Sequence, residues 1–271
     1  MGKYIQIEFQ NISPERSDIL VAELSQIGFE GFEEGEENLK AFIPASDFDD
    51  AAIREVAERN NISYHQTFID DTNWNAVWES SFQPVIVDDF VAIRAEFHDP
   101  IAGVEHEIVI TPKMSFGTGH HATTYMMIQQ MRDINFAGKT VLDFGTGTGI
   151  LAILSEKLGA KNIQAIDNDD WSIANAAENI ASNDCDRIKL EKADSFQPGE
   201  RFDIILANIN KNVILDNFSI LVNKLLPGGI LVLSGLLIDD EAAILARFDQ
   251  FPLKFSGKLT DRSWICLRFD H

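Results

Sequence analysis

The chain has 271 residues, 45% of them hydrophobic and 24% charged, which is the balance of a globular protein with enough apolar material for a core. The formal net charge of -21 argues against a nucleic-acid enzyme, because such enzymes carry basic stripes for phosphates. It favours a basic partner, with a role in solubility alone as the alternative. The two cysteines, Cys185 and Cys266, match no metal spacing, so we expect no metal site. We find neither a signal-peptide pattern nor a run of 18 apolar residues, which predicts a cytoplasmic protein that needs no membrane.

Residues 1–70 are predicted to form a small domain of their own. The expected elements are a strand around 5–9, a helix from Ser13 and Pro14 to Gly28, strands at 29–33 and 39–43, a helix opened by a capping box at Ser46 and Asp49, and a strand at 62–69. This βαββαβ order is that of a ferredoxin-like α+β sandwich. The segment holds 15 acidic and 5 basic residues and no nucleophile–base pair. We therefore interpret it as a binding domain, with a purely structural role as the alternative.

A connector and a larger domain follow. Residues 71–84 carry Trp74 and Trp78 on one face of a predicted linker helix, and 85–271 are predicted to form the second domain. Extended segments are expected at 85–87, 90–94 and 107–110, and β-rich runs at 140–144, 162–167, 188–191, 202–207 and 230–234 alternate with helical stripes. That alternation predicts a Rossmann-like parallel sheet covered by helices on both faces. The tail, 253–258 and 263–269, is expected to add paired antiparallel strands.

A glycine-rich loop, Gly145-Thr146-Gly147-Thr148-Gly149, comes directly after the first apolar strand of the alternating region. A dinucleotide fingerprint would need a third glycine at position 150, which is Ile150, and a phosphate loop would need Gly-Lys followed by Ser or Thr. The remaining form, an acid followed by three alternating glycines, resembles the first motif of Rossmann-like methyltransferases.

Two polar residues lie at the ends of the second and fourth of these strands. Asp167 is placed to accept the two ribose hydroxyls of an adenosine, although it would serve an NAD enzyme equally well, and helix capping is the alternative. Asn208 ends the fourth strand, where its amide offers a donor and an acceptor to the cofactor or to a reacting amine, with a plain turn residue as the alternative.

Four segments together resemble the ribosomal protein L-eleven methyltransferases, the PrmA family. They are Thr111–Thr124 with its Phe116-Gly117-Thr118-Gly119-His120-His121 core, Val141–Ala160, Phe202–Ile209 and Leu233–Leu237. The chain departs from the usual family pattern at His120-His121-Ala122 and at Thr146 and Thr148. Its N-terminal part is shorter than is usual in the family.

The resemblance implies a class I methyltransferase fold behind a ferredoxin-like substrate-binding domain, with S-adenosyl-L-methionine as cofactor. It also implies transfer of methyl groups to amino groups, chiefly lysine, of that basic ribosomal protein. We expect the protein to be a monomer. It implies cofactor contacts at Thr124, Gly145, Gly147, Asp167 and Asn208, and at Phe116 and Thr118 in the preceding loop, with Asn208 also nearest the chemistry. We expect His120 and His121 to pack the loop, with a role as catalytic bases as the alternative. The alternatives are a methyltransferase of the same fold acting on a nucleic-acid base or a small molecule, and a protein that binds the cofactor without turnover.

Overall fold

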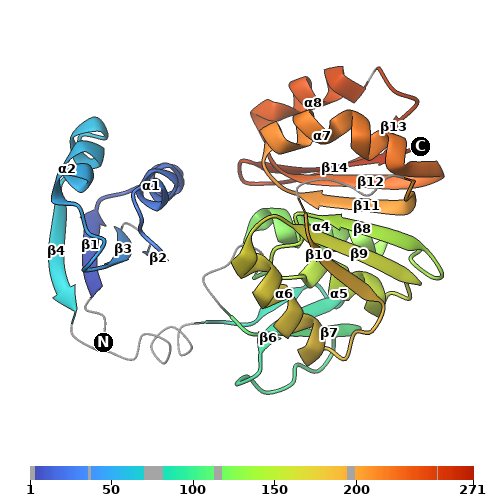
Figure 1. Ribbon diagram of the computed structural model, residues 1–271, viewed down its shortest axis with the longest axis horizontal. Coiled ribbons are helices and arrows are strands. Elements are labelled where there is room, and N and C mark those ends of the chain that lie inside the picture. Colours follow the sequence, from blue (N-terminus) through green and yellow to red (C-terminus); the bar gives the residue numbers. More distant parts are fainter. Residues whose placement is uncertain (1–3, 36–37, 70–81, 113–117, 194–198, 249) are drawn as a thin grey trace. The chain divides into compact units, whose positions relative to one another are not determined.

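The computed structural model describes residues 4–35, 38–69, 82–112, 118–193, 199–248 and 250–271. The chain separates into two compact units, Met1–Ser81 and Phe82–His271. Each unit has its own sheet and its own hydrophobic core (Figure 1). The linker helix predicted at 71–84 lies outside the described residues except for 82–84, which have no regular structure.

The first unit is a four-stranded antiparallel sheet with two helices. Its elements are β1 (Tyr4–Gln10), α1 (Pro14–Gln26), β2 (Gly31–Glu34), β3 (Asn38–Pro44), α2 (Asp50–Arg59) and β4 (Tyr64–Ile69). The strand order is β2-β3-β1-β4. The alternation seen in the sequence of β1 is real, because Ile5, Ile7 and Phe9 are buried in the core of this unit while their neighbours are not.

The start predicted for the second helix at Ser46 is wrong. Helix α2 begins at Asp50, and Asp49 is its N-cap, whose Oδ1 accepts hydrogen bonds from the backbone N–H groups of Ala51 (2.8 Å) and Ala52 (3.3 Å). Residues 45–47 form a turn instead, closed by the N–H of Asp47 donating to the carbonyl of Pro44 (2.9 Å). A single carboxylate that satisfies two otherwise unpaired helix N–H groups sets the helix start three residues later.

The second unit is built on a seven-stranded sheet in the order β10-β9-β8-β11-β12-β14-β13. These strands are β8 (Thr140–Phe144), β9 (Asn162–Asp167), β10 (Ile188–Lys192), β11 (Phe202–Asn208), β12 (Leu225–Leu237), β13 (Lys254–Asp261) and β14 (Trp264–Asp270). The first five are parallel, and β14 pairs antiparallel with both β12 and β13, so the predicted antiparallel edge is confirmed.

Helices cover both faces of this sheet, as the alternation predicted. Figure 1 shows α7 (Lys211–Lys224) and α8 (Glu241–Phe248) on one face, and α4 (Ala122–Arg132), α5 (Ile150–Lys157) and α6 (Asp170–Ser182) on the other. A second sheet of β5 (Val85–Val87), β6 (Val91–Ala95) and β7 (His106–Ile110) contacts α5 and α6 through β7. No helix among the described residues is long and apolar enough to cross a membrane.

The order of the parallel strands fixes where a ligand site can lie. From β8 the chain adds β9 and β10 on one side, and then crosses to add β11 and β12 on the other side. The connections that leave β8 and β11 therefore diverge to opposite faces, which opens a crevice at the carboxyl ends of these two strands.

Candidate active site

A cavity of about 520 Å³ lies at the carboxyl ends of β8, β9 and β11. Its walls come from the glycine loop after β8, the ends of β9, β11 and β12, the first turns of α4, α6 and α7, and β14. The lining includes five of the seven cofactor residues expected from the resemblance, namely Thr124, Gly145, Gly147, Asp167 and Asn208. Among the described residues, no group of His, Cys, Asp or Glu side chains could hold a metal ion.

The glycine loop has backbone φ angles that other residues adopt only with strain. Gly145, Gly147 and Gly149 have φ values of 76°, 54° and 83°, in the left-handed region. A Cβ at Gly145 would overlap Cγ2 of Ile209, and a Cβ at Gly235 would overlap the backbone of the same residue. Glycines at 145 and 235 therefore let the backbone pack directly against Ile209, and all three residues line the cavity. Gly149 is the N-cap of α5, so the start of a helix points its N–H groups toward this loop.

Asp167 ends β9 at the cavity, half-buried, and its carboxylate is already oriented. Its Oδ2 accepts from the N–H of Gly147 (2.9 Å), and its Oδ1 accepts from the N–H of Asp169 (3.1 Å). Each carboxylate oxygen has two acceptor sites, so both oxygens keep capacity for one more donor. The N-cap of α6 is Asp169, not Asp167. A carboxylate held in this way suits the paired hydroxyls of a ribose.

Asn208 ends β11 and reaches across the cavity toward α4. Its Nδ2 donates to the hydroxyl of Thr124 (3.2 Å), a residue 84 positions away in the sequence. Thr124 is buried in the first turn of α4. This contact holds the amide plane of Asn208 and directs its Oδ1 away from Thr124, so the site has a fixed carbonyl oxygen that can accept an N–H.

The two remaining expected contacts are placed differently. Phe116 lies outside the described residues, and Thr118 is not part of the cavity wall. The hydroxyl of Thr118 lies 3.0 Å from Nδ1 of His120, whose Nε2 lies 2.9 Å from the carbonyl of Gln83. A carbonyl only accepts, so Nε2 carries the proton and Nδ1 accepts from Thr118. Desolvation lowers the pKa of His120, which favours this neutral form.

Two aromatic side chains in the wall were not foreseen as site residues. His121 caps α4, with its Nδ1 accepting from the N–H of Thr123 (3.3 Å), and its ring meets the indole of Trp264 edge to face at 4.7 Å. Both line the cavity. The sequence carries no signal for Trp264, because its place depends on β14 pairing with β12, whose end forms the cavity wall at Gly235.

Comparisons with known proteins agree with this geometry. A model of the family described as "Ribosomal protein L11 methyltransferase (PrmA)" matches residues 6–271. Proteins with that name from Porphyromonas gingivalis and Chlorobaculum tepidum are both 40% identical to this chain; the first alignment covers 93% of this chain and 90% of the relative, and the second 88% and 86%.

A crystal structure of the ribosomal protein L11 methylase from Lactobacillus delbrueckii subsp. bulgaricus superposes with a TM-score of 0.64 at 30% identity, over 69% of this chain and 97% of that chain. The second unit therefore has the mixed α/β fold of the class I methyltransferases. With a family match over nearly its whole length, this chain belongs to the ribosomal protein L11 methyltransferase (PrmA) family.

Proposed function

We propose that this chain transfers methyl groups from S-adenosyl-L-methionine to amino groups, chiefly of lysine, on the large-subunit ribosomal protein L11. The observation that carries the proposal is the cavity in which Gly145, Asp167, Asn208 and Thr124 meet at the carboxyl ends of the parallel strands. The names of the relatives supply the substrate. A ribosomal substrate also implies a cytoplasmic location.

The residues present fit this cofactor. Asp167 would accept the ribose hydroxyls, and the glycine loop with the N-terminus of α5 would receive the carboxylate of the methionine part. Gly145 and Gly235 let the backbone that lines the cavity pack directly against Ile209. When bound, the cofactor would supply a methyl group on a positively charged sulfur. The amine would attack the methyl carbon in line with the carbon–sulfur bond, and the sulfur would leave.

The protein's main contribution is to hold the attacking amine on that line. A lysine amine has an ordinary pKa near 10.4 and must lose its proton before it attacks, and desolvation in the cavity favours the neutral form. Oδ1 of Asn208, fixed by the Nδ2 contact with Thr124, is the acceptor we assign to an N–H of the amine. This leaves the nitrogen lone pair directed at the methyl carbon. We assign no dedicated catalytic base.

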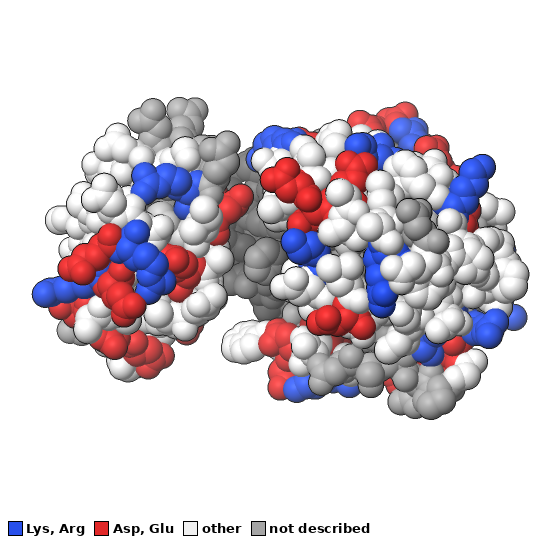
Figure 2. Space-filling model, turned by 90° about the horizontal axis from the view of Figure 1, so that it is seen from above, with Lys and Arg blue, Asp and Glu red and all other residues white. Residues whose placement is uncertain are grey.

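The first unit is the part that we propose binds the ribosomal protein. Its element order and its strand order, β2-β3-β1-β4, support its assignment as a ferredoxin-like domain. Residues 1–70 contain 15 acidic and 5 basic side chains. On the face seen in Figure 2, acidic and basic side chains of this unit lie intermixed, so attraction of a basic protein would come from the net charge more than from one patch.

The test is methyl transfer from tritium-labelled S-adenosylmethionine to purified L11, followed by mass spectrometry of the modified lysines. Gly145→Arg is expected to abolish labelling, because its side chain would enter the cavity and clash with Ile209. Gly138→Arg is the matched control, since Gly138 has a similar φ of 72° but nothing within 4 Å of its Cβ position. Labelling that persists in Gly145→Arg would overturn the site, and labelling of other proteins but not L11 would overturn the substrate.

A further inference from the structure

A row of asparagines runs along the face of α6 that meets β7. Asn175 and Asn179 lie within the helix and Asn183 is its C-cap, so the three amides stand one turn apart on the same face. Asn175 and Asn179 are almost fully buried, at 1% and 0% exposure. Asparagine is a poor residue for a helix interior, and a buried amide is costly unless it is hydrogen-bonded. The hydrogen-bond partners of these amides therefore indicate the structural role of the three asparagines.

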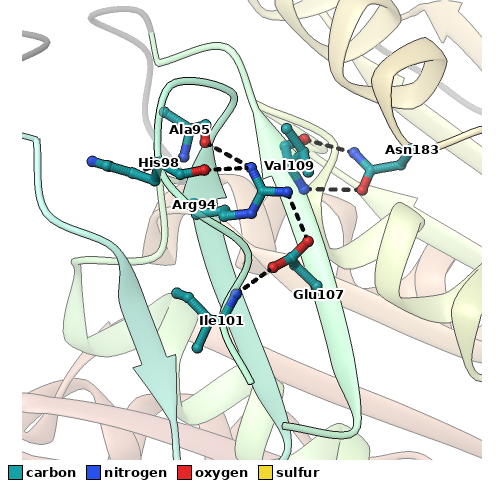
Figure 3. A network of polar contacts seen from close by, with 7 residues as sticks. All are labelled: Arg94, Ala95, His98, Ile101, Glu107, Val109 and Asn183. Carbon is teal, nitrogen blue, oxygen red and sulfur yellow. Dashed lines mark hydrogen bonds and ion pairs between the residues drawn. The ribbon is translucent and has the colours of Figure 1, made fainter. Parts of the chain in front are cut away.

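Asn183 binds the outer edge of β7 as a neighbouring strand would. Its Oδ1 accepts from the N–H of Val109 (3.0 Å) and its Nδ2 donates to the carbonyl of the same residue (2.6 Å), as Figure 3 shows. The other edge of β7 pairs with β6. Two hydrogen bonds thus fasten the end of α6 to the small sheet.

The small sheet to which Asn183 binds is stabilised by an ion pair between β6 and β7. Arg94 of β6 donates from Nη2 to Oε1 of Glu107 in β7 (2.9 Å), and from Nη1 to the carbonyls of Ala95 (3.1 Å) and His98 (3.0 Å). The other oxygen of Glu107 accepts from the N–H of Ile101 (2.9 Å). The Arg94 side chain is only 11% exposed, which favours a well-defined geometry for this charged pair.

Asn179 differs from Asn183 because it joins two separate parts of the chain. Its Oδ1 accepts from the N–H of Thr111, just past β7 (2.7 Å). Its Nδ2 donates to the carbonyl of Thr148 in the glycine loop (2.8 Å) and to Oδ1 of Asn175 (2.8 Å). One buried amide therefore connects the segment that leaves the small sheet to the loop that lines the cavity.

The contact with Thr148 controls one peptide plane of the glycine loop. The carbonyl of Thr148 and the N–H of Gly149 belong to the same planar unit, and that N–H donates to the carbonyl of Thr146 (2.9 Å). Gly149 has no side chain to cap α5 and has a left-handed φ, so its backbone has wide freedom by itself. Asn179 holds the carbonyl side of the plane and so limits the orientation of the loop.

We propose that Asn179 is a positioning residue for the cofactor site: it sets the Thr148–Gly149 peptide and thereby the shape of the glycine loop that receives the methyl donor. This inference rests on the proposed function for the identity of the ligand. The position of the loop itself does not depend on that identity, because the hydrogen bonds of Asn179 are all within the chain.

The experiment compares Asn179→Ala with Asn183→Ala in the full chain. Both substitutions remove one amide from the same face of α6 and break hydrogen bonds to the backbone, but only Asn179 contacts the glycine loop. Binding of S-adenosylhomocysteine is measured by calorimetry, thermal unfolding reports stability, and hydrogen exchange without ligand reports the mobility of residues 145–149.

Asn179→Ala is expected to raise Kd about tenfold, which corresponds to about 1.4 kcal/mol, and to speed exchange in 145–149. Asn183→Ala is expected to lower the melting temperature without changing either quantity. Equal changes of Kd in both variants, or unchanged exchange in Asn179→Ala, would overturn the inference. If Asn179→Ala does not fold, Asn179→Ser takes its place, since its short hydroxyl bonds within the helix and does not reach the carbonyl of Thr148.

The two proposals fail separately in this design. A parent chain that binds no S-adenosylhomocysteine contradicts the proposed function. The exchange comparison still decides the role of Asn179 in that case, because it is made without ligand.

Discussion

Replacing Asp143 by Asn should change how stability depends on pH. Asp143 lies within the apolar run of β8, one residue before the strand ends, and is fully buried, with 0% exposure. Burial is the main cause that raises its pKa to about 7 from an ordinary 3.8, against the hydrogen bonds that Oδ2 accepts from the hydroxyl of Thr146 (2.6 Å) and the N–H of Ala152 (3.2 Å). Among the described residues, Oδ1 of Asp143 has no hydrogen-bond partner.

The magnitude follows from proton linkage. Between the two pKa values, the folded chain holds a proton that the unfolded chain has released, so stability falls as pH rises through this window and is fully present only below it. Each pH unit is worth about 1.4 kcal/mol, so ionising Asp143 costs on the order of 4 kcal/mol between pH 3.8 and about 7. Asn has nearly the same shape and does not titrate, so Asp143→Asn removes this dependence.

The assay is urea unfolding of both proteins at pH values from about 4 to about 8. The free energy of unfolding of Asp143→Asn minus that of the parent should increase by about 4 kcal/mol as pH rises across the window, because only the parent must bury a charge. All other titrating groups are common to the two proteins and cancel in the difference. A difference that stays constant with pH would refute the reasoning, since it would mean that the carboxylate of Asp143 is ionised in the fold at its ordinary pKa.

Three further outcomes are expected. Asp49→Ala should destabilise the first unit by about 1 kcal/mol, seen as faster hydrogen exchange in α2, because two N–H groups lose their acceptor; unchanged exchange would contradict the observed cap. The hydrogen bond from Arg94 lowers the pKa of Glu107, so its stabilisation is present above pH 4.5 and is lost as pH falls through the lowered pKa. Glu107→Gln should therefore unfold at lower urea than the parent near neutral pH, and the gap should close in acid; a gap that persists there would show that the charge is unimportant. Burial raises the pKa of both thiols, that of Cys185 to about 11 and that of Cys266 further, so an aromatic disulfide reagent should titrate neither at neutral pH until urea is added. Immediate release of one equivalent would contradict the raised pKa of the partly exposed Cys185.

The glycine loop and the strands around it could be predicted because their signals are local. Val141, Leu142 and Phe144 form an apolar run that must be a buried strand, and the glycines after it allow the turn that other residues resist. Asp167 and Asn208 follow two more such runs. Since parallel strands end at one edge of a sheet, their meeting at one cavity follows from the pattern alone.

The local signals predicted the wrong helix start where two candidate N-cap residues lie close together in the sequence. Ser46 and Asp49 are both good N-cap residues, and the pattern favoured the first. The structure decides for Asp49, because Pro44 and Asp47 close a turn that places Ser46 before the helix. The choice depends on backbone geometry that a capping motif does not encode.

The sequence by itself determined the three-layer character of the second unit, the strand after which the ligand loop comes, and the polar residues at the strand ends, since these depend on periodicity and on neighbours within a few positions. Only the tertiary structure decided that Trp264 and His121 share a wall, that Asn208 is oriented by Thr124, and that Asn179 connects Thr111 with Thr148. Each of these contacts joins segments tens of residues apart or more. Their partners become neighbours only when strand order and helix packing are complete, so no window along the chain contains them.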